Sequence, residues 1–267
     1  MMKSLKYINL AFFALTIIIN ALANLMPFGG GNTGEISAKY PNLFTPAPIT
    51  FSIWGIIYLM VAFFIFYQFG LLNHAYADSF VRLAGYWFII SCVMNIGWIF
   101  SWHFDAIWLS MVFMVGLLLS LIILTIRISP IAIMSETDTK SIPLLARLCM
   151  YGFDIYLGWI CAATIANLSV LLVKMNWDRF SFSEEFWTVI VLLVGAILGI
   201  LFIFMSRRYM SALAIIWAYC GILIKHIDQN GYAGSHPLII IVTLLSISII
   251  LAAGIVRMLM DRFQNRM

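Results

Sequence analysis

Aromatic rings and side-chain amides recur at helical spacing in three apolar stretches of the chain. Phe51, Trp54 and Tyr58 would share one face of a helix. Two longer sets keep the same period: Trp87, Ser91, Asn95, Trp98 and Trp102, and then Tyr156, Trp159, Ala163 and Asn167. Rings supply stacking area and amides supply a few oriented hydrogen bonds, so these faces could together bind a flat, hydrophobic molecule in one pocket.

The same residue types also have structural uses, which spacing alone does not separate from binding. Trp and Tyr collect at membrane interfaces, and we assign five Trp residues near span ends mostly to such belts: Trp87, Trp102, Trp108, Trp177 and Trp187. Asn95 and Asn167 could equally join helices by hydrogen bonds. Whether Trp54, Trp98 and Trp159 point into a site therefore stays open at this level.

The composition excludes a soluble globular domain. Hydrophobic residues make up 64% of the chain and charged residues 10%, whereas soluble proteins carry roughly a quarter charged residues. We therefore expect an all-α membrane protein whose partner is the lipid bilayer. The net charge of +4 does not imply nucleic acid, because Lys and Arg gather in the cytoplasmic connections of membrane proteins.

Eight stretches are long and apolar enough to span a membrane. They are Ile8–Leu25, Thr50–Gly70, Leu83–Trp102, Ala106–Ile126, Ile155–Val173, Trp187–Ser206, Tyr209–Ile224 and Leu238–Val256. The seventh is the shortest, and whether it crosses fully stays open. With the N-terminus inside, eleven of the 15 Lys and Arg residues face the cytoplasm and four face outside. We therefore expect both termini in the cytoplasm, most simply at a bacterial inner membrane.

The start of the chain resembles a secretory signal. Lys3 and Lys6 precede an apolar run that contains Ala21-Leu22-Ala23, a triplet typical of a cleavage site. The run continues to Leu25, and Asn20 lies within it, where an amide is useful for hydrogen bonds between helices. We interpret this segment as the first membrane helix.

Two connections are long. Met26–Ile49 contains a glycine-rich run and four of the seven prolines; it lacks the Lys-Ser/Thr of a phosphate loop, and we expect a turn-rich lid on the outside. Arg127–Asp154 is expected to be the main cytoplasmic loop, with residues 135–138 as a solvated turn or helix start. Gly195 and Gly199 form a G-x-x-x-G pair, for which we favour packing within the chain over dimerisation.

Few residues offer bond-making chemistry. We expect no ionisable side chain in mid-span, because the candidates fall in connections or at helix ends: Asp78, Asp105, Asp154, Lys225, His226 and Asp228. This distribution disfavours an ion-coupled transporter or a proton pump, although it leaves a carrier of neutral molecules open. The four Cys residues show no metal spacing. We therefore expect no metal site and no conventional enzyme.

Three separated motifs resemble the tryptophan-rich sensory protein family, TspO, also known as the translocator protein or peripheral benzodiazepine receptor family. They are the P-x-P-x-x-F-x-x-W-x-x-x-Y run from Pro46 to Tyr58, Asn95-x-x-Trp98, and Tyr156-x-x-Trp159-x-x-x-Ala163-Thr164-x-x-Asn167. The order and span positions also match, over roughly residues 8 to 175 as five helices. The three spans that follow exceed the usual length of the family.

The resemblance implies a five-helix bundle that binds porphyrins and other hydrophobic ligands in a cavity closed by the loop after the first helix. The candidate ligand-binding residues are Trp54, Tyr58, Asn95, Trp98, Tyr156, Trp159, Ala163 and Asn167. Trp159 would occupy the position of the tryptophan implicated in light-dependent porphyrin breakdown in some members. The chain departs from the family at three places that bear on the identity of the ligand: Lys39-Tyr40-Pro41-Asn42, Ser101-Trp102 and Ile155.

We thus expect a TspO-like membrane bundle over residues 1–175, followed by additional C-terminal transmembrane helices over 176–267. The expected function is binding of a hydrophobic aromatic or tetrapyrrole-like molecule, for sensing or handling. The alternative is a secondary carrier for an uncharged or amphipathic solute. No cofactor is expected beyond a possible porphyrin ligand, and a homo-oligomer formed through membrane helices is possible.

Overall fold

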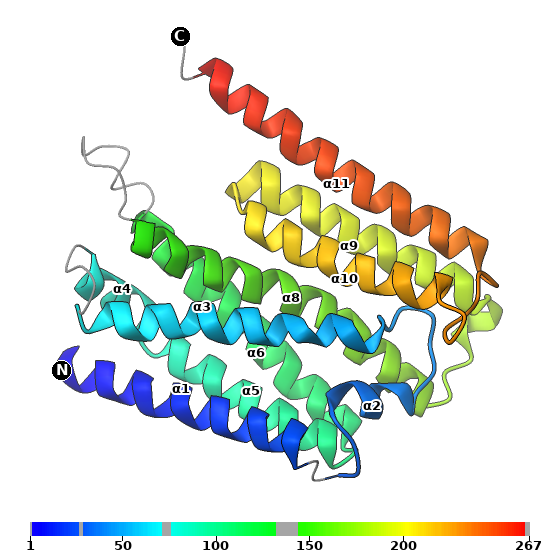
Figure 1. The fold of residues 1–267 in the computed structure, drawn as a ribbon, viewed down its shortest axis with the longest axis horizontal. Coiled ribbons are helices and arrows are strands. Elements are labelled where there is room, and N and C mark those ends of the chain that lie inside the picture. The colour runs from blue at the N-terminus through cyan, green and yellow to red at the C-terminus, as the bar shows by residue number, and fades with distance from the viewer. Residues whose placement is uncertain (1, 27–28, 71–75, 132–143, 265–267) are drawn as a thin grey trace.

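The computed structural model describes residues 2–26, 29–70, 76–131 and 144–264, and regular structure within these ranges is entirely helical (Figure 1). The long helices are α1 (Met2–Leu25), α3 (Ile53–Gln68), α5 (Trp87–His103), α6 (Ile107–Ile128), α8 (Leu144–Lys174), α9 (Glu184–Ser206), α10 (Tyr209–Ile227) and α11 (Pro237–Gln264). The short ones are α2 (Thr33–Ala38), η1 (Pro48–Ser52), α4 (Ala77–Ala84) and η2 (Arg179–Ser181). In the described residues, seven helices are long and apolar enough to cross a membrane, and the bent pair of α4 and α5 gives an eighth. The expected all-α membrane fold is confirmed.

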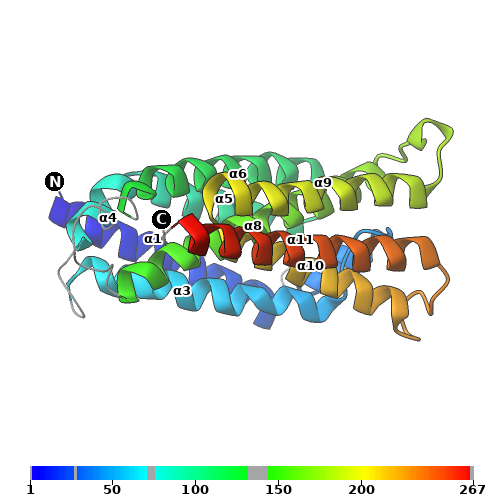
Figure 2. The same ribbon diagram turned by 90° about the horizontal axis from the view of Figure 1, so that it is seen from above.

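The long helices run roughly parallel to one another (Figures 1 and 2). Helices α1, α3, α5, α6 and α8 pack into one bundle, and α10 joins α9 and α11 to it through α8. The first residues of α1 and the last turn of α11 lie at the same end of the molecule (Figure 1). The division of the chain at residue 175 stays a prediction.

Helix α10 approaches α8 at backbone distance. A Cβ atom added at Gly158 of α8 would lie 2.1 Å from the carbonyl oxygen of Ser211 in α10. The Ser211 hydroxyl donates to the carbonyl of Asp154, at 2.8 Å. Only a residue without a side chain permits this contact, so Gly158 sets the position of α10.

The third expected span, Leu83–Trp102, is wrong as a single helix. Helix α4 ends at Ala84 and α5 begins at Trp87, with an angle of 60° between them. Gly85 adopts the positive φ of 54° at this break, a conformation that glycine takes without steric cost. Helix α4 is tied to α1 by the ion pair of Lys6 and Asp78, 2.8 Å apart.

The expected loop Arg127–Asp154 is also wrong at both ends. Helix α6 continues to Ile128, and α8 begins at Leu144, eleven residues before the expected Ile155. Ala146, Cys149 and Phe153 are buried at helical spacing, which explains why the helix extends so far. Residues 135–138 lie outside the described residues.

Asp154 consequently lies within a helix rather than in a connection, contrary to expectation. Its side chain is 10% exposed and pairs with Arg208, which is 12% exposed. The same guanidinium donates to the Thr125 carbonyl at 2.7 Å and to the Ser129 hydroxyl at 2.6 Å. A buried charge is tolerated only with such partners, and this one joins α6, α8 and the start of α10.

The G-x-x-x-G pair of α9 faces other helices of the same chain. A Cβ at Gly195 would lie 2.3 Å from the Tyr219 hydroxyl of α10, and one at Gly199 would lie 3.1 Å from Ile250 of α11. The interpretation as packing within the chain is therefore confirmed.

Candidate ligand cavity

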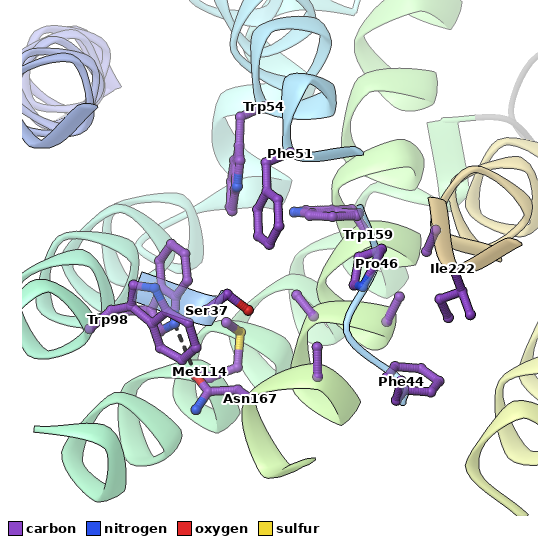
Figure 3. Close-up of a pocket in the computed structure, with 15 residues that line it drawn as sticks. Ser37, Phe44, Pro46, Phe51, Trp54, Trp98, Met114, Trp159, Asn167 and Ile222 are labelled. Atoms are coloured by element: carbon purple, nitrogen blue, oxygen red, sulfur yellow. Dashed lines mark hydrogen bonds between the residues drawn. The ribbon is translucent and has the colours of Figure 1, made fainter. Parts of the chain in front are cut away.

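The aromatic faces of α3, α5 and α8 meet around one cavity, which we call the aromatic cavity (Figure 3). Helices α2, α6 and α10 and the segment before η1 complete its wall. Its lining residues are Ser37, Phe44, Pro46, Phe51, Trp54, Trp98, Trp102, Met114, Trp159, Ala162, Ala163, Ala166, Asn167, Ala218 and Ile222. Only about 30 Å³ of this cavity is wide enough for water. This form is closed, and a larger ligand requires rings or the loop to move.

Trp54 stands at the centre of a ring cluster. Its ring centroid lies 5.8 Å from that of Trp98 and 6.3 Å from that of Trp159, which it meets edge to face. Phe51 meets Trp159 edge to face as well, with centroids 5.9 Å apart. These are the offset and T-shaped arrangements that aromatic quadrupoles prefer. A flat aromatic molecule could replace part of this stacking.

The indole N–H groups around the cavity differ in their partners. Trp98 donates to Asn167 Oδ1 at 3.0 Å, and Trp102 donates to the carbonyl of Thr33 in α2 at 3.1 Å. Trp159 is 2% exposed, and its N–H has no hydrogen-bond acceptor among the described residues. In Figure 3 the nitrogen of Trp159 points toward the space beside Phe51. This N–H is a donor buried in an apolar cavity.

A family model described as TSPO-like protein matches residues 6–257. The chain belongs to the TSPO-like protein family. The match extends from α1 into α11, so it includes the three helices that follow the region in which the motifs were found. No curated protein and no solved structure matches the chain.

In this TSPO-like protein, five of the eight predicted site residues line the aromatic cavity: Trp54, Trp98, Trp159, Ala163 and Asn167. Tyr58 instead lines a second cavity on the other side of Trp54. Asn95 and Tyr156 line neither of the two and bond to each other, with Asn95 Nδ2 donating to the Tyr156 hydroxyl at 3.0 Å. Whether any of the eight binds a ligand stays a prediction.

Both predicted amides of the TSPO-like protein join helices. Asn95 Oδ1 accepts from Asn20 of α1 at 2.8 Å, so Asn95 connects α1, α5 and α8. Asn167 Nδ2 donates to the Ser110 hydroxyl of α6 at 3.1 Å. Asn167 lines the cavity as well, so it has a structural role and is also within reach of a ligand.

Sequence reasoning missed several lining residues. Trp102 was assigned to an interfacial belt, but it is 4% exposed and faces the cavity; its place four residues after Trp98 was the available signal. Phe51 was placed on the correct face without being taken as a site residue. Ala218 and Ile222 of α10 carry no signal beyond being apolar.

The connection between α1 and η1 holds α2 and supplies one wall of the cavity through Ser37, Phe44 and Pro46. Asn32 caps α2 by accepting from the backbone N–H groups of Gly34 and Glu35, which fixes the first turn. The segment, which we call the lid, thus consists of a helix and an extended strip, and whether it opens and closes stays a prediction.

The C-terminal helices hold this lid. Leu43 N–H donates to Glu184 Oε1 at 2.9 Å, while the Leu43 carbonyl lies 2.9 Å from Nε2 of His226. Three further hydrogen bonds follow the same strip: Tyr232 hydroxyl to the Asn42 carbonyl at 3.0 Å, Ala47 N–H to the Gly221 carbonyl at 3.0 Å, and Trp217 N–H to the Thr50 carbonyl at 2.8 Å. Residues of α9, α10 and the turn after α10 therefore keep the lid in place.

At the same end of the molecule, Asp105 joins the lid to the ends of α5 and α8. Its carboxylate accepts from the Tyr40 hydroxyl at 2.5 Å and lies 2.8 Å from Lys174 Nζ. Partial burial acts to raise the pKa of Asp105, but the hydrogen bonds from Lys174 and Tyr40 and the positive charges of Lys174 and Lys39 together hold it below its usual value. The ionised carboxylate is thus the form that fits this contact.

Proposed function

We propose that this protein binds a flat, hydrophobic molecule of aromatic or tetrapyrrole-like type in the aromatic cavity, in order to sense or handle it. The observation that carries the proposal is the buried N–H of Trp159, which faces ring-lined space without an acceptor. A donor left unpaired in such a place costs about 1–3 kcal/mol. A ligand with an acceptor atom would remove this cost, so the ligand should carry one.

The lining supports an uncharged, planar ligand. It consists of rings, alanines and other apolar side chains, with Ser37 and Asn167 as its only polar side chains beside the indoles, and no charged residue among them. Small-molecule sites commonly combine apolar walls with a few placed polar groups. Binding would require the lid or the rings to move, because little of the cavity is open in this form.

A carrier for an uncharged or amphipathic solute is the candidate from another class. A roomy second cavity lies beside the aromatic one and shares Phe51 and Trp54 with it, which would suit stepwise passage. For either function we propose a bacterial inner membrane with both termini in the cytoplasm, on the distribution of Lys and Arg along the chain.

The test of binding is a titration of the purified protein with protoporphyrin, followed by tryptophan fluorescence. Wild type should bind saturably, and Trp159→Phe should bind more weakly by about 1–3 kcal/mol because the donor is gone. The matched control is Trp108→Phe, whose ring is 66% exposed on the outer face of α6; it should bind as wild type does. Absence of saturable binding, or equal binding by all three proteins, would contradict the proposal.

Proteoliposomes separate the binding protein from the carrier. A binding protein should retain protoporphyrin without moving it into the vesicle lumen. Uptake that depends on the protein and is lost in Trp159→Phe would establish the carrier instead.

A further inference from the structure

A second cavity lies between α1 and α3, beneath the lid, and we call it the α1–α3 groove. It has about 510 Å³ of space wide enough for water and is therefore much roomier than the aromatic cavity in this form. Its lining residues are Ile17, Asn20, Ala21, Asn24, Leu25, Asn32, Thr33, Gly34, Pro48, Phe51, Ser52, Trp54, Gly55 and Tyr58. The binding function proposed for the aromatic cavity does not use this space.

One buried amide offers a free acceptor to the groove. Asn20 is 6% exposed, and its Nδ2 donates to the Thr16 carbonyl at 2.9 Å and to Asn95 Oδ1 at 2.8 Å. These bonds fix the orientation of the amide. Among the described residues nothing donates to its oxygen, Oδ1, and this oxygen is not one of the fully buried unpaired atoms, so a molecule in the groove can reach it. A ligand with an O–H or N–H group would provide the missing donor.

The rest of the lining defines an uncharged, amphipathic occupant. Asn24, Asn32, Thr33 and Ser52 add polar groups, and none of the lining side chains is charged. Ile17, Ala21, Leu25 and Pro48 form an apolar side. A small hydroxylated head would face the amides, while a hydrocarbon chain would follow the apolar residues.

The wall of the groove that α3 forms has free space at Gly55. Gly55 is exposed, and a Cβ atom added to it would meet no heavy atom within 4 Å. Phe51 and Trp54 line both cavities, so these two rings lie where the groove and the aromatic cavity meet.

We propose that the α1–α3 groove is a second binding site, which takes an uncharged amphipathic molecule with a hydroxylated head of the glycerol type. The head donates to Asn20 Oδ1, and the chain lies against the apolar residues of α1. Such a molecule can be a membrane lipid or a free monoacyl amphiphile, and both present the same head chemistry. The inference is independent of what the aromatic cavity binds.

The probe is a monoacylglycerol with a photoreactive diazirine in its acyl chain, at low mole fraction in phosphatidylcholine nanodiscs that contain the full chain. We expect saturable labelling of α1 and α3, competed by unlabelled monoacylglycerol. Gly55→Phe should abolish this labelling because the ring fills the groove, whereas Gly55→Ala should retain it. Asn20→Ala should weaken competition by about fivefold or more, the usual effect of removing one buried hydrogen bond.

One further variant and two competitors complete the test. Trp159→Phe should leave labelling unchanged, so a failure of the aromatic cavity to bind porphyrin does not bear on the groove. Competition by octyl glycerol supports the proposed site and indicates that it takes a free monoacyl amphiphile. Competition by diacylglycerol but not by octyl glycerol supports the site and indicates that it takes a membrane lipid. Labelling that does not saturate, spreads evenly over the lipid-facing helices, or persists in Gly55→Phe overturns the proposal. Because a Cβ added at Gly55 would meet no heavy atom within 4 Å, Gly55→Phe should fold even where Asn20→Ala does not.

Discussion

The indole nitrogen of Trp98 lies 3.0 Å from Oδ1 of Asn167, and this bond joins α5 to α8 across the wall of the aromatic cavity. Trp159, on the same helix as Asn167, is equally buried but has no acceptor. Two tryptophans of one cavity thus differ in a single respect: the N–H of one stabilises the fold, and that of the other is available to a ligand.

This difference predicts unequal stability for two matched substitutions. Trp98→Phe and Trp159→Phe remove the same atoms from buried positions, but only the first removes a hydrogen bond and leaves Asn167 with one donor fewer. Trp98→Phe should therefore lower the free energy of unfolding by about 1 kcal/mol more than Trp159→Phe. Thermal unfolding of both variants in the same detergent measures the difference. Equal melting temperatures would show that the Trp98–Asn167 bond contributes nothing.

The contact between Glu184 and Leu43 predicts a local change in hydrogen exchange. Glu184→Gln replaces a charged acceptor of the Leu43 N–H with a neutral one, so the amide of Leu43 should exchange up to about tenfold faster. Glu185→Gln is the matched control, because the neighbouring carboxylate pairs with His236, whereas the Leu43 N–H donates to Glu184. Hydrogen exchange resolved to the peptide around Leu43 provides the measurement. Identical exchange in both variants would mean that the Glu184 contact does not hold the lid at Leu43.

The low pKa of Asp105 predicts that stability falls in acid. The pKa of Asp105 in the folded protein lies below the ordinary 3.8. The ionised carboxylate therefore stabilises the fold fully above pH 3.8, and this stabilisation is lost as the pH falls through the folded pKa. Unfolding temperature followed from neutral pH to below 3.8 should drop less in Asp105→Asn than in wild type. Asp228→Asn should keep the drop of the wild type, because in the described part of the chain the Asp228 carboxylate accepts from Asn230 alone. If the unfolding temperature of Asp105→Asn fell as much in acid as that of wild type, ionised Asp105 would not be what stabilises the fold.

The buried pair of Asp154 and Arg208 predicts that one substitution lowers the stability of the fold strongly and that replacing both residues restores part of it. Asp154→Asn leaves a buried guanidinium without its counter-charge and should lower the free energy of unfolding by about 3 kcal/mol. Replacing both residues with apolar ones, Asp154→Leu with Arg208→Met, should restore part of this loss, because no charge then remains buried. Thermal unfolding of the single and double variants tests the pair. A double variant less stable than Asp154→Asn would show that the pair is itself a net source of stability.

The helices were largely predictable because their cause is compositional. Runs of about twenty apolar residues have few alternatives in a membrane, and seven of the eight expected stretches each coincide with one long helix, while the third covers the end of α4, the bend and α5. The bend before α5 was missed because one glycine at positive φ decides it, and the early start of α8 was missed because Arg147 and Asp154 made an amphipathic stretch resemble a loop.

The site was predictable only where residue types were distinctive. Trp54, Trp98 and Trp159 were found because large rings at helical spacing are rare enough to notice. The contribution of α10 was not found, because Ala218 and Ile222 resemble any other apolar residues and only tertiary packing brings them to the cavity. The same holds for the hydrogen bonds to the lid, which join residues more than 140 positions apart.

Because α10 supplies part of the cavity wall, occupancy of the cavity and attachment of the C-terminal helices are thermodynamically linked. A molecule that contacts Ala218 or Ile222 binds the docked arrangement better than an undocked one, and by reciprocity the docked helices raise its affinity by the same factor. A partner that draws α9, α10 and α11 away from α8 would therefore lower the affinity for the molecule without touching the cavity. The C-terminal helices would in this sense be a second input to the proposed binding equilibrium.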